Sequence, residues 1–388
     1  MTIRSAACDH RAVPLSSSEV SRRLAAVTWM LKPAGGRCNL DCGYCYARRD
    51  HEPRMSSATL EAFFAAVLPI AGEDVSICWQ GGEPTLMGVE WFREMLAIQR
   101  RHERRGQCVL SSIQTNATLI DEEWARFVAT ERFLVGASID GSAVAHDRYR
   151  VGASGGSYDA AVAGVNRLGR RRIPYNVLTV VTDANVKEPQ RTWDALTSLG
   201  ARWLQMIPAV EWDPAHPGQP ASFVVEPEAY GDFLCELFDL WFERRQQISV
   251  RLFDSAIRTL VYGSASQCTQ ASRCSAQLTV AADGRVYPCD HFMVDAWQLG
   301  SVQEHGDWLA ALDWERFDAF AARKEPQAPA CEDCDYLRFC HGGCPKHRPA
   351  EDAVSHVCQS TRMWLEHGLP DLEALAATIR RRTLVGRR

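Results

Sequence analysis

The sequence predicts a mixed α/β protein: a partial (β/α)6 TIM-like barrel followed by a cysteine-rich domain. Two observations lead to this fold class. Between residues 25 and 210, six apolar runs typical of strands alternate with segments of helical periodicity. Beyond residue 262, these periodic patterns give way to loops rich in cysteine. The chain of 388 residues is too long for one small domain, so two or three domains are expected.

The alternating region is expected to form a parallel sheet. Its strand-like runs are 27–31, 75–79, 111–114, 134–139, 175–181 and 203–207. Its helix-like segments are 56–70, 88–104, 121–130, 157–171 and 188–199. Ser56, Ser57 and Glu61 are start signals for the first helix, and Gly200 provides a cap after the last one. Strands that alternate with helices imply right-handed crossovers, and such a sheet gathers its functional loops at the carboxyl ends of its strands.

The same patterns divide the chain into five regions. These are a polar, irregular lead-in at 1–24, the barrel at 25–225, linking helices at 226–262, the cysteine-rich domain at 263–365, and a C-terminal helix with a basic tail at 366–388. The linking region begins with an amphipathic helix at about 226–246. Asp283-Gly284, between two strand-like runs, predicts a hairpin within the cysteine-rich domain.

Composition narrows the possible functions. A net charge of −5 gives no indication of nucleic-acid binding. No stretch approaches 18 apolar residues, and the first 20 residues lack the apolar core of a signal peptide, so we expect a cytoplasmic protein without a membrane partner. Fifteen cysteines in such a chain favour metal binding over disulfides.

The first cysteine group follows the first predicted strand directly. Cys38, Cys42 and Cys45 lie in a CxxxCxxC spacing, so one short loop offers three thiolates. A structural zinc site would need a fourth ligand to close its tetrahedron. Closely spaced cysteines usually hold iron–sulfur clusters, normally with four cysteines, so three leave one iron open to a small molecule. A zinc knuckle or buried free thiols are the alternatives.

The second cysteine group lies in the last third of the chain and contains eight thiols, enough for two complete four-cysteine sites. Closed sites of this kind serve structure or electron transfer rather than substrate activation. Two zinc ribbons are the alternative interpretation. The eight residues are Cys268, Cys274, Cys289, Cys331, Cys334, Cys340, Cys344 and Cys358.

The first cysteine motif, with Tyr44 directly before its last cysteine, resembles that of the radical S-adenosylmethionine (SAM) enzymes. The resemblance implies that the open iron binds the amino and carboxylate groups of SAM, and that one electron cleaves SAM to a 5′-deoxyadenosyl radical. Gly81-Gly82-Glu83-Pro84 follows the second strand and matches the family element that contacts the SAM amino group. An arginine fork fits a carboxylate, and an apolar strand-end residue suits adenine. The residues expected to contact SAM are Tyr44, Gly82, Glu83, Ser138, Arg150 and Val210.

The second cysteine group resembles the SPASM extension of radical SAM enzymes, which holds two auxiliary 4Fe–4S clusters. The resemblance implies interleaved ligation, with Cys268, Cys274, Cys289 and Cys344 at one cluster and Cys331, Cys334, Cys340 and Cys358 at the other. Asp290 directly follows a predicted ligand, Cys289. A carboxylate beside an electron-accepting cluster is well placed to take a proton where the electron leaves, so Asp290 is the candidate base.

Together these motifs resemble the anaerobic sulfatase-maturating enzymes, over residues 25 to 365. Cys340-His341-Gly342-Gly343-Cys344-Pro345, within the full cysteine pattern, is the most specific run. The resemblance implies that a cysteine or serine in a target sulfatase loses a β-hydrogen, a proton and an electron to become Cα-formylglycine. It also implies SAM and three 4Fe–4S clusters as cofactors, a Cys/Ser-x-Pro/Ala-x-Arg motif in the sulfatase, and a small electron-transfer protein as reductant.

Two alternatives remain open at this stage. A SPASM enzyme could instead introduce a thioether or carbon–carbon crosslink into a ribosomally made precursor peptide. A protein from another class could use the same cysteines without catalysis, as an iron–sulfur or zinc protein that carries electrons or scaffolds a partner. The choice between cysteine and serine as target is not predicted by these motifs.

Overall fold

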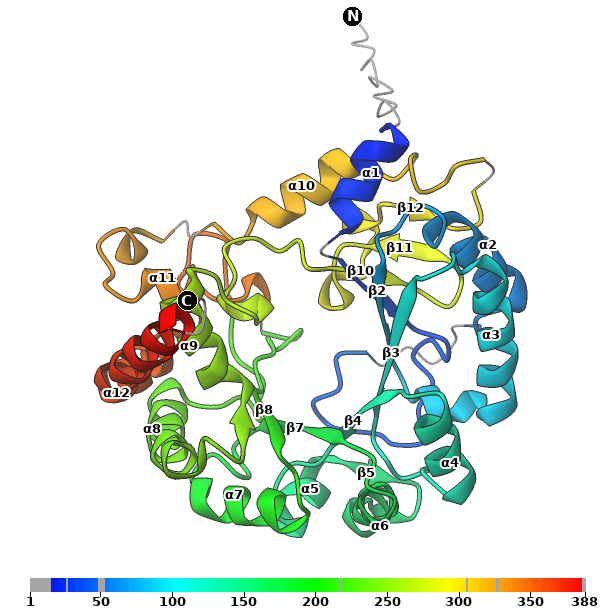
Figure 1. The fold of residues 1–388 in the computed structure, drawn as a ribbon. Helices are drawn as coiled ribbons and strands as arrows, with labels where there is room; N and C mark the ends of the chain where they lie inside the picture. Colours follow the sequence, from blue (N-terminus) through cyan, green and yellow to red (C-terminus); the bar gives the residue numbers. More distant parts are fainter. Residues whose placement is uncertain are drawn as a thin grey trace, which may run out of the picture.

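The computed structural model describes residues 15–385, apart from 26, 48–52, 217, 305 and 326–327. Most of the predicted lead-in and the last residues of the basic tail therefore lie outside the described residues. A ten-stranded sheet forms the centre, in the order β12-β11-β10-β1-β2-β3-β4-β7-β8-β9. Figure 1 shows this sheet as an arc with helices along its outer side.

Six parallel strands form the barrel, and each overlaps a predicted strand run. They are β1 (Thr28–Leu31), β2 (Asp74–Trp79), β3 (Cys108–Thr115), β4 (Leu134–Ser138), β7 (Tyr175–Val181) and β8 (Trp203–Pro208). A short seventh strand, β9 (Ser249–Val250), pairs in parallel with β8. The parallel direction brings the carboxyl ends of all these strands to one side of the sheet.

The connecting helices cover the outer side of the arc (Figure 1). They are α2 (Ser57–Val67), α3 (Val89–His102), α4 (Glu122–Thr130), α5 (Ala143–Tyr149), α6 (Tyr158–Arg170) and α7 (Pro189–Ser198). The predicted start of α2 is made by Ser56, whose hydroxyl accepts a hydrogen bond from the Thr59 amide at 3.1 Å. The short α5 was not predicted, nor was the hairpin of β5 (Val151–Gly152) and β6 (Gly155–Gly156) that follows it.

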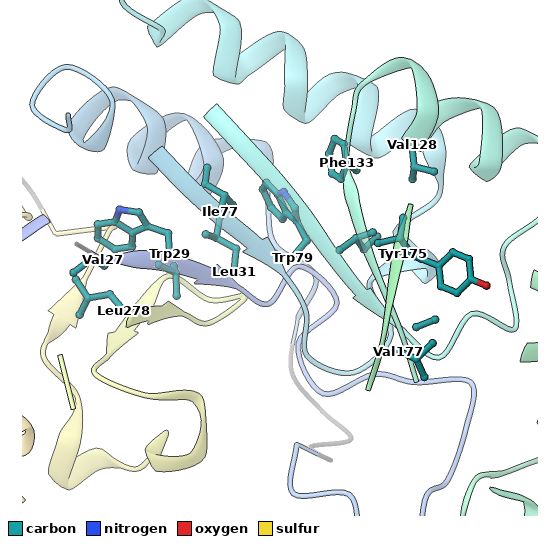
Figure 2. Packing of buried hydrophobic residues seen from close by; sticks show 14 of the residues in the cluster. Val27, Trp29, Leu31, Ile77, Trp79, Val128, Phe133, Tyr175, Val177 and Leu278 are labelled. Atoms are coloured by element: carbon teal, nitrogen blue, oxygen red, sulfur yellow. The ribbon is translucent and has the colours of Figure 1, made fainter. Parts of the chain in front are cut away.

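Alternate side chains of the strands face opposite sides of the sheet. On the outer side Trp29 packs edge-on against Phe63, at 5.1 Å between ring centroids, and Trp79 packs in the same way against Phe92 at 5.6 Å. Figure 2 shows this layer continuing from Leu278 to Val177. The residues in between on the same strands, such as Met30, Cys78, Gln114 and Ser138, are only half-buried and face the concave side.

The cysteine-rich region shares the barrel's sheet. Its predicted hairpin is formed by β10 (Gln277–Val280) and β11 (Arg285–Tyr287), and β12 (Gly300–Ser301) pairs with β11. β10 pairs in parallel with β1, and Gln277 lies opposite Thr28. The residues that follow β11, including Cys289 and Asp290, are thereby brought to the barrel.

The remaining helices lie before β1 or after β8 in the chain. They are α1 (Ser17–Leu24), α8 (Pro227–Arg244), α9 (Arg251–Tyr262), α10 (Trp314–Ala322), α11 (Leu337–Cys340) and α12 (Cys358–Val385). Single 3-10 turns lie at Pro84–Met87, Cys268–Gln270, Asp290–Phe292, Asp295–Trp297, Pro329–Cys331 and Pro345–His347.

The end of the lead-in forms a helix, so this polar segment is ordered in part. α1 buries Val20 and Leu24, and Arg23 donates two hydrogen bonds of 2.9 Å to Asp318 of α10. The amphipathic pattern here spans only eight residues, too short to be distinguished from a polar loop in the sequence. No helix in the described ranges is long and apolar enough to cross a membrane.

Candidate active site and cysteine groups

The first cysteine loop follows β1 and is held by the backbone around β5. The Asp41 amide donates to the Val151 carbonyl at 2.7 Å, and the Gly43 amide donates to the Tyr149 carbonyl at 3.0 Å. Leu40 forms an isolated β-bridge with Gly152. The loop therefore presents Cys38, Cys42 and Cys45 from a backbone that the segment after α5 fixes in place.

The three thiols of this loop influence one another electrostatically. Burial raises the pKa of Cys42 to about 12; the Arg150 charge opposes this rise, and the Cys45 and Cys38 thiolates add to it. Three thiolates on one short loop repel one another without a bound cation, so this donor set fits a multi-iron centre. Across the described ranges, no three Cys, His, Asp or Glu side chains converge closely enough to hold a single metal ion. In a 4Fe–4S cluster each cysteine binds a different iron, so its thiols need not meet at one point.

Asp140 organises the side chains beside this loop. Its buried carboxylate accepts hydrogen bonds from Arg150 Nε at 2.8 Å, from the Val180 amide at 2.9 Å, and from the Tyr44 hydroxyl. The Arg150 guanidinium lies over the Tyr44 ring, 5.4 Å from its centroid. Two predicted SAM-contacting residues are thus neighbours of each other and of Cys42. The ion pair between Asp140 and Arg150 was not predicted from the sequence.

The Gly81-Gly82-Glu83-Pro84 turn follows β2 and packs against the loop after β1. Gly82 has a φ of +49°, and a Cβ there would lie 2.0 Å from the Arg37 carbonyl oxygen, so only glycine fits. The buried Glu83 carboxylate accepts hydrogen bonds from the amide and hydroxyl of Thr85, the hydroxyl of Thr115 and the amide of Asn116, at 2.6 to 3.0 Å. Glu83 therefore ties this turn to the end of β3, and its contact with SAM stays a prediction.

The other two predicted SAM contacts lie on different strands. Ser138, at the end of β4, accepts a hydrogen bond from Gln114 Nε2 at 3.0 Å on the concave side. Val210 is buried just after β8. Both lie near strand ends, as the barrel rule requires, and their contacts with SAM also stay predictions.

Asp290 is buried and held by side chains from three segments. Gln80 Nε2 donates to Oδ2 at 2.8 Å, Gln277 Nε2 donates to Oδ1 at 3.1 Å, and the Tyr46 hydroxyl donates to Oδ2. Gln277 Nε2 also lies 3.3 Å from the Cys289 sulfur, so it contacts both the candidate base and a predicted cluster ligand. Sequence reasoning missed these three partners, although Gln80 and Tyr46 directly adjoin quoted motifs.

Neighbouring groups stabilise the Asp290 carboxylate. Burial alone would raise the pKa of Asp290, but the electrostatic influence of His291 and Lys32 and the donors just described lower it below its usual value. The Tyr46 ring lies 4.2 Å from the His291 ring, centroid to centroid, and 4.8 Å from Lys346 Nζ. These neighbours favour the ionised form of the Asp290 carboxylate.

The eight later cysteines fall into two electrostatic groups. In the first, burial raises the pKa of Cys268, Cys274 and Cys289, and the Cys344 thiolate adds to the rise in all three. In the second, burial raises the pKa of Cys358, and the thiolates of Cys340, Cys331 and Cys334 add to the rise. The two groups coincide with the two ligand sets that the resemblance implies, although ligation itself stays a prediction.

Comparison with known proteins agrees with this fold and site. A profile of the radical SAM superfamily matches residues 33–196, and one of the SPASM iron-sulfur cluster-binding domain matches residues 268–335. The fold and site thus define a radical SAM enzyme with a SPASM domain. The chain is 31% identical to a cysteine-type anaerobic sulfatase-maturating enzyme of Clostridium perfringens, over 90% of this chain and 98% of that one. It is 29% identical to a serine-type enzyme of Bacteroides thetaiotaomicron, over 89% and 90%.

The solved structures give the same result. A structure described as native anSMEcpe with bound AdoMet superposes with a TM-score of 0.84 at 29% identity, over 91% of this chain and all of that one. One with a bound Kp18Cys peptide gives 0.85 at 30% identity, over 91% and 99%. The chain belongs to the anaerobic sulfatase-maturating enzyme family. The predicted fold class and family are confirmed, and the non-enzymatic alternative is excluded.

Proposed function

We propose that this enzyme oxidises a cysteine or serine of a target sulfatase to Cα-formylglycine. The observation that carries the proposal is the buried carboxylate of Asp290, which three donors hold in the barrel next to Cys289. Oxidation of a carbon that bears a thiol or hydroxyl needs a proton acceptor close to an electron acceptor, and this position offers both. The cysteine-type and serine-type names of the relatives support the same reaction.

Each group of residues at the site has its own proposed role. Cys38, Cys42 and Cys45 would hold a 4Fe–4S cluster, which together with SAM would supply the radical that removes a hydrogen atom from the substrate β-carbon. Arg150, Ser138 and the Gly82 backbone would bind the polar end of SAM, and Tyr44 and Val210 would pack near its adenine. The two later cysteine groups would hold auxiliary clusters, which would supply an electron acceptor.

Asp290 performs the proton transfer in this proposal. A substrate S–H or O–H approaches Oδ2, where Tyr46 and Gln80 now donate, and the carboxylate takes its proton as the β-carbon loses its electron. Gln277 holds the other oxygen and keeps the carboxylate oriented. Solved relatives with bound Cp18Cys and Kp18Cys peptides support a polypeptide substrate, which we propose carries the Cys/Ser-x-Pro/Ala-x-Arg motif. A small electron-transfer protein would supply the initial electron.

The test uses reconstituted, reduced protein, SAM and two peptides, one with Cys-x-Pro-x-Arg and one with Ser-x-Pro-x-Arg. The expected product is an aldehyde, captured by an aminooxy probe and located by mass spectrometry at the target residue. A matched peptide with alanine at the target should give no adduct. Deoxyadenosine without an aldehyde would contradict the proposal, and an internal thioether or carbon–carbon bond in place of the aldehyde would favour the crosslinking alternative.

A further inference from the structure

Lys324 is a fully buried cation between two cysteine loops. It follows α10, and its side chain has no exposed surface. Its Nζ donates to the Thr269 carbonyl at 2.7 Å and to the Gly343 carbonyl. Thr269 adjoins Cys268 and Gly343 adjoins Cys344, so one ammonium joins two loops that lie far apart in the chain.

Thiols of both later cysteine groups influence the Lys324 ammonium electrostatically. Burial lowers the pKa of Lys324, whereas Cys344, Cys274 and Cys268 of one group, and then Cys340 of the other, act in the opposite direction. Within the described ranges no carboxylate forms an ion pair with Lys324. With a cluster bound, its thiolate ligands would supply the negative charge that compensates this buried ammonium.

Arg348 fixes the backbone that carries Lys324. Its buried guanidinium donates to the Lys324 carbonyl at 3.0 Å, to the Arg323 carbonyl at 3.0 Å, and to the Gly342 carbonyl at 3.1 and 3.2 Å. The turn after α10 is thus held against the loop before Cys344. This support places the Lys324 ammonium at a set position beside the cysteines, which a flexible surface lysine would not have.

A fixed cation beside a cluster changes its reduction potential. Reduction adds one negative charge to a centre that four thiolates already make negative, so a nearby cation stabilises the reduced form more than the oxidised form. Cys289, whose thiol interacts with Cys344 and Cys268, directly precedes the candidate base Asp290. The centre that Lys324 adjoins is therefore the later centre closest in the chain to the proton acceptor.

We propose that Lys324 is a positioning residue that raises the reduction potential of the auxiliary centre held by Cys268, Cys274, Cys289 and Cys344. This inference rests on the proposed function, in which Asp290 takes one proton and an auxiliary centre would accept one electron from the substrate radical. We take the centre beside Lys324 as that acceptor, which would then be reduced by one electron. Without the ammonium this centre would accept the electron less readily. A smaller fraction of the substrate radicals would then be oxidised to formylglycine.

The test is a redox titration of the reconstituted full-length protein, followed by electron paramagnetic resonance without substrate. The signal of this centre is identified as the one lost in Cys268→Ala. Lys324→Gln keeps a donor without the charge, Lys324→Arg keeps the charge, and the exposed Lys187→Gln is the matched control. In Lys324→Gln we expect the reduced-to-oxidised ratio at a fixed potential to fall about tenfold, equivalent to about 59 mV. In Lys324→Arg and Lys187→Gln we expect less than about a twofold change.

Iron and sulfide contents separate the electrostatic role from a structural one. Parent-like contents with a lowered potential in Lys324→Gln support the proposal. A parent-like potential in that variant would overturn it, and so would equal loss of iron from the Gln and Arg variants, which would make Lys324 only a crosslink between loops. With substrate, Lys324→Gln should release more deoxyadenosine per formylglycine. The titration needs no substrate, so a failure of formylglycine formation would not be mistaken for a failure of this inference.

Discussion

Asp290 stays ionised because of the groups placed around it rather than because of solvent. Burial opposes the charge, and Lys32, His291 and the donors on both oxygens overcome that opposition. Such a carboxylate is a weak base in the resting enzyme. Its basicity must therefore increase when the substrate displaces a donor, and the displaced donor would be Tyr46 or Gln80 on Oδ2.

The first prediction concerns the carboxylate itself. Asp290→Asn removes the proton acceptor and keeps the side chain's shape, so SAM cleavage should continue while product formation falls by about 100-fold or more. Deoxyadenosine and aldehyde are measured in the same reaction by chromatography and mass spectrometry. Asp295→Asn, a change in an exposed carboxylate after the same turn, is the control. Equal deoxyadenosine and aldehyde yields in parent and Asp290→Asn would remove Asp290 from the mechanism.

A second prediction follows from the direction of the pKa shift. Because the Asp290 pKa is lowered, the folded enzyme loses this charge only as the pH falls through that lowered value. In the parent enzyme, protonation of Asp290 should therefore not reduce the aldehyde yield at or above pH 3.8, the ordinary pKa of an aspartate. Removing Lys32 and the Tyr46 hydroxyl leaves fewer groups to oppose burial, the largest influence, so the pKa should rise.

The Lys32→Met/Tyr46→Phe variant tests this direction. Its aldehyde yield per deoxyadenosine should decline as the pH is lowered towards about 5, and Lys32→Arg/Tyr46→Phe should decline less because it keeps the cation. Tyr175→Phe, which removes a hydroxyl bonded to the Leu199 carbonyl, is the control. A ratio that is independent of pH in the Met/Phe variant would show that these groups do not set the charge of Asp290.

At the scale of elements, the turns after β1 and β2 depend on each other. The Glu83 amide donates to the Arg37 carbonyl at 2.7 Å, directly before Cys38. The Gly82 backbone lies against the same carbonyl in a left-handed conformation. The turn that is proposed to contact SAM therefore also supports the loop that carries the three cysteines.

A third prediction tests this dependence. Gly82→Ala adds a Cβ where the Arg37 carbonyl already lies, on top of a strain of about 1–3 kcal/mol for a side chain at positive φ. The variant should lose thermal stability and much of the iron bound at the first cysteine loop. Its iron content is compared with that of Cys42→Ala, which lacks one predicted ligand of this loop. Gly169→Ala, where nothing lies within 4 Å, should match or exceed the parent in stability. Parent-like iron binding in Gly82→Ala would show that the turns after β1 and β2 do not depend on each other.

Elements with strong local patterns could be predicted, and pairings between distant segments could not. The six barrel strands and five of their helices have clear periodicity, and the Asp283-Gly284 turn marks the β10–β11 hairpin. The parallel pairing of β10 with β1 joins residues far apart in the chain, so no local pattern shows it. For the same reason the cysteines and Asp290 could be chosen from the sequence, whereas Gln277 and Lys324 could not.

At the scale of the whole molecule, the barrel and the cysteine-rich region are joined beside the candidate base. The sheet continues from β1 into β10, and the segment after β8 contacts the segment after Cys344. Trp212 Nε1 donates to the Lys346 carbonyl at 3.0 Å, and the Lys346 ammonium pairs with Glu211. The same ammonium lies over the Tyr46 ring, so the contact between the two regions also positions a neighbour of Asp290.

The last prediction concerns this contact. The side chains of Lys346 and Glu211 are 15% and 28% exposed, so their ion pair is less screened than a surface pair. Glu211→Gln and Lys346→Gln should each lower thermal stability and aldehyde yield. A double-mutant cycle should give a coupling of about 1–3 kcal/mol, against about 0–1 kcal/mol for the exposed Glu188–Arg191 pair. Additive effects at Glu211 and Lys346 would show that the sheet alone joins the two regions. Coupling in stability without coupling in aldehyde yield would confine the pair to a structural role, because Tyr46 would then keep its place beside Asp290 without the Lys346 charge.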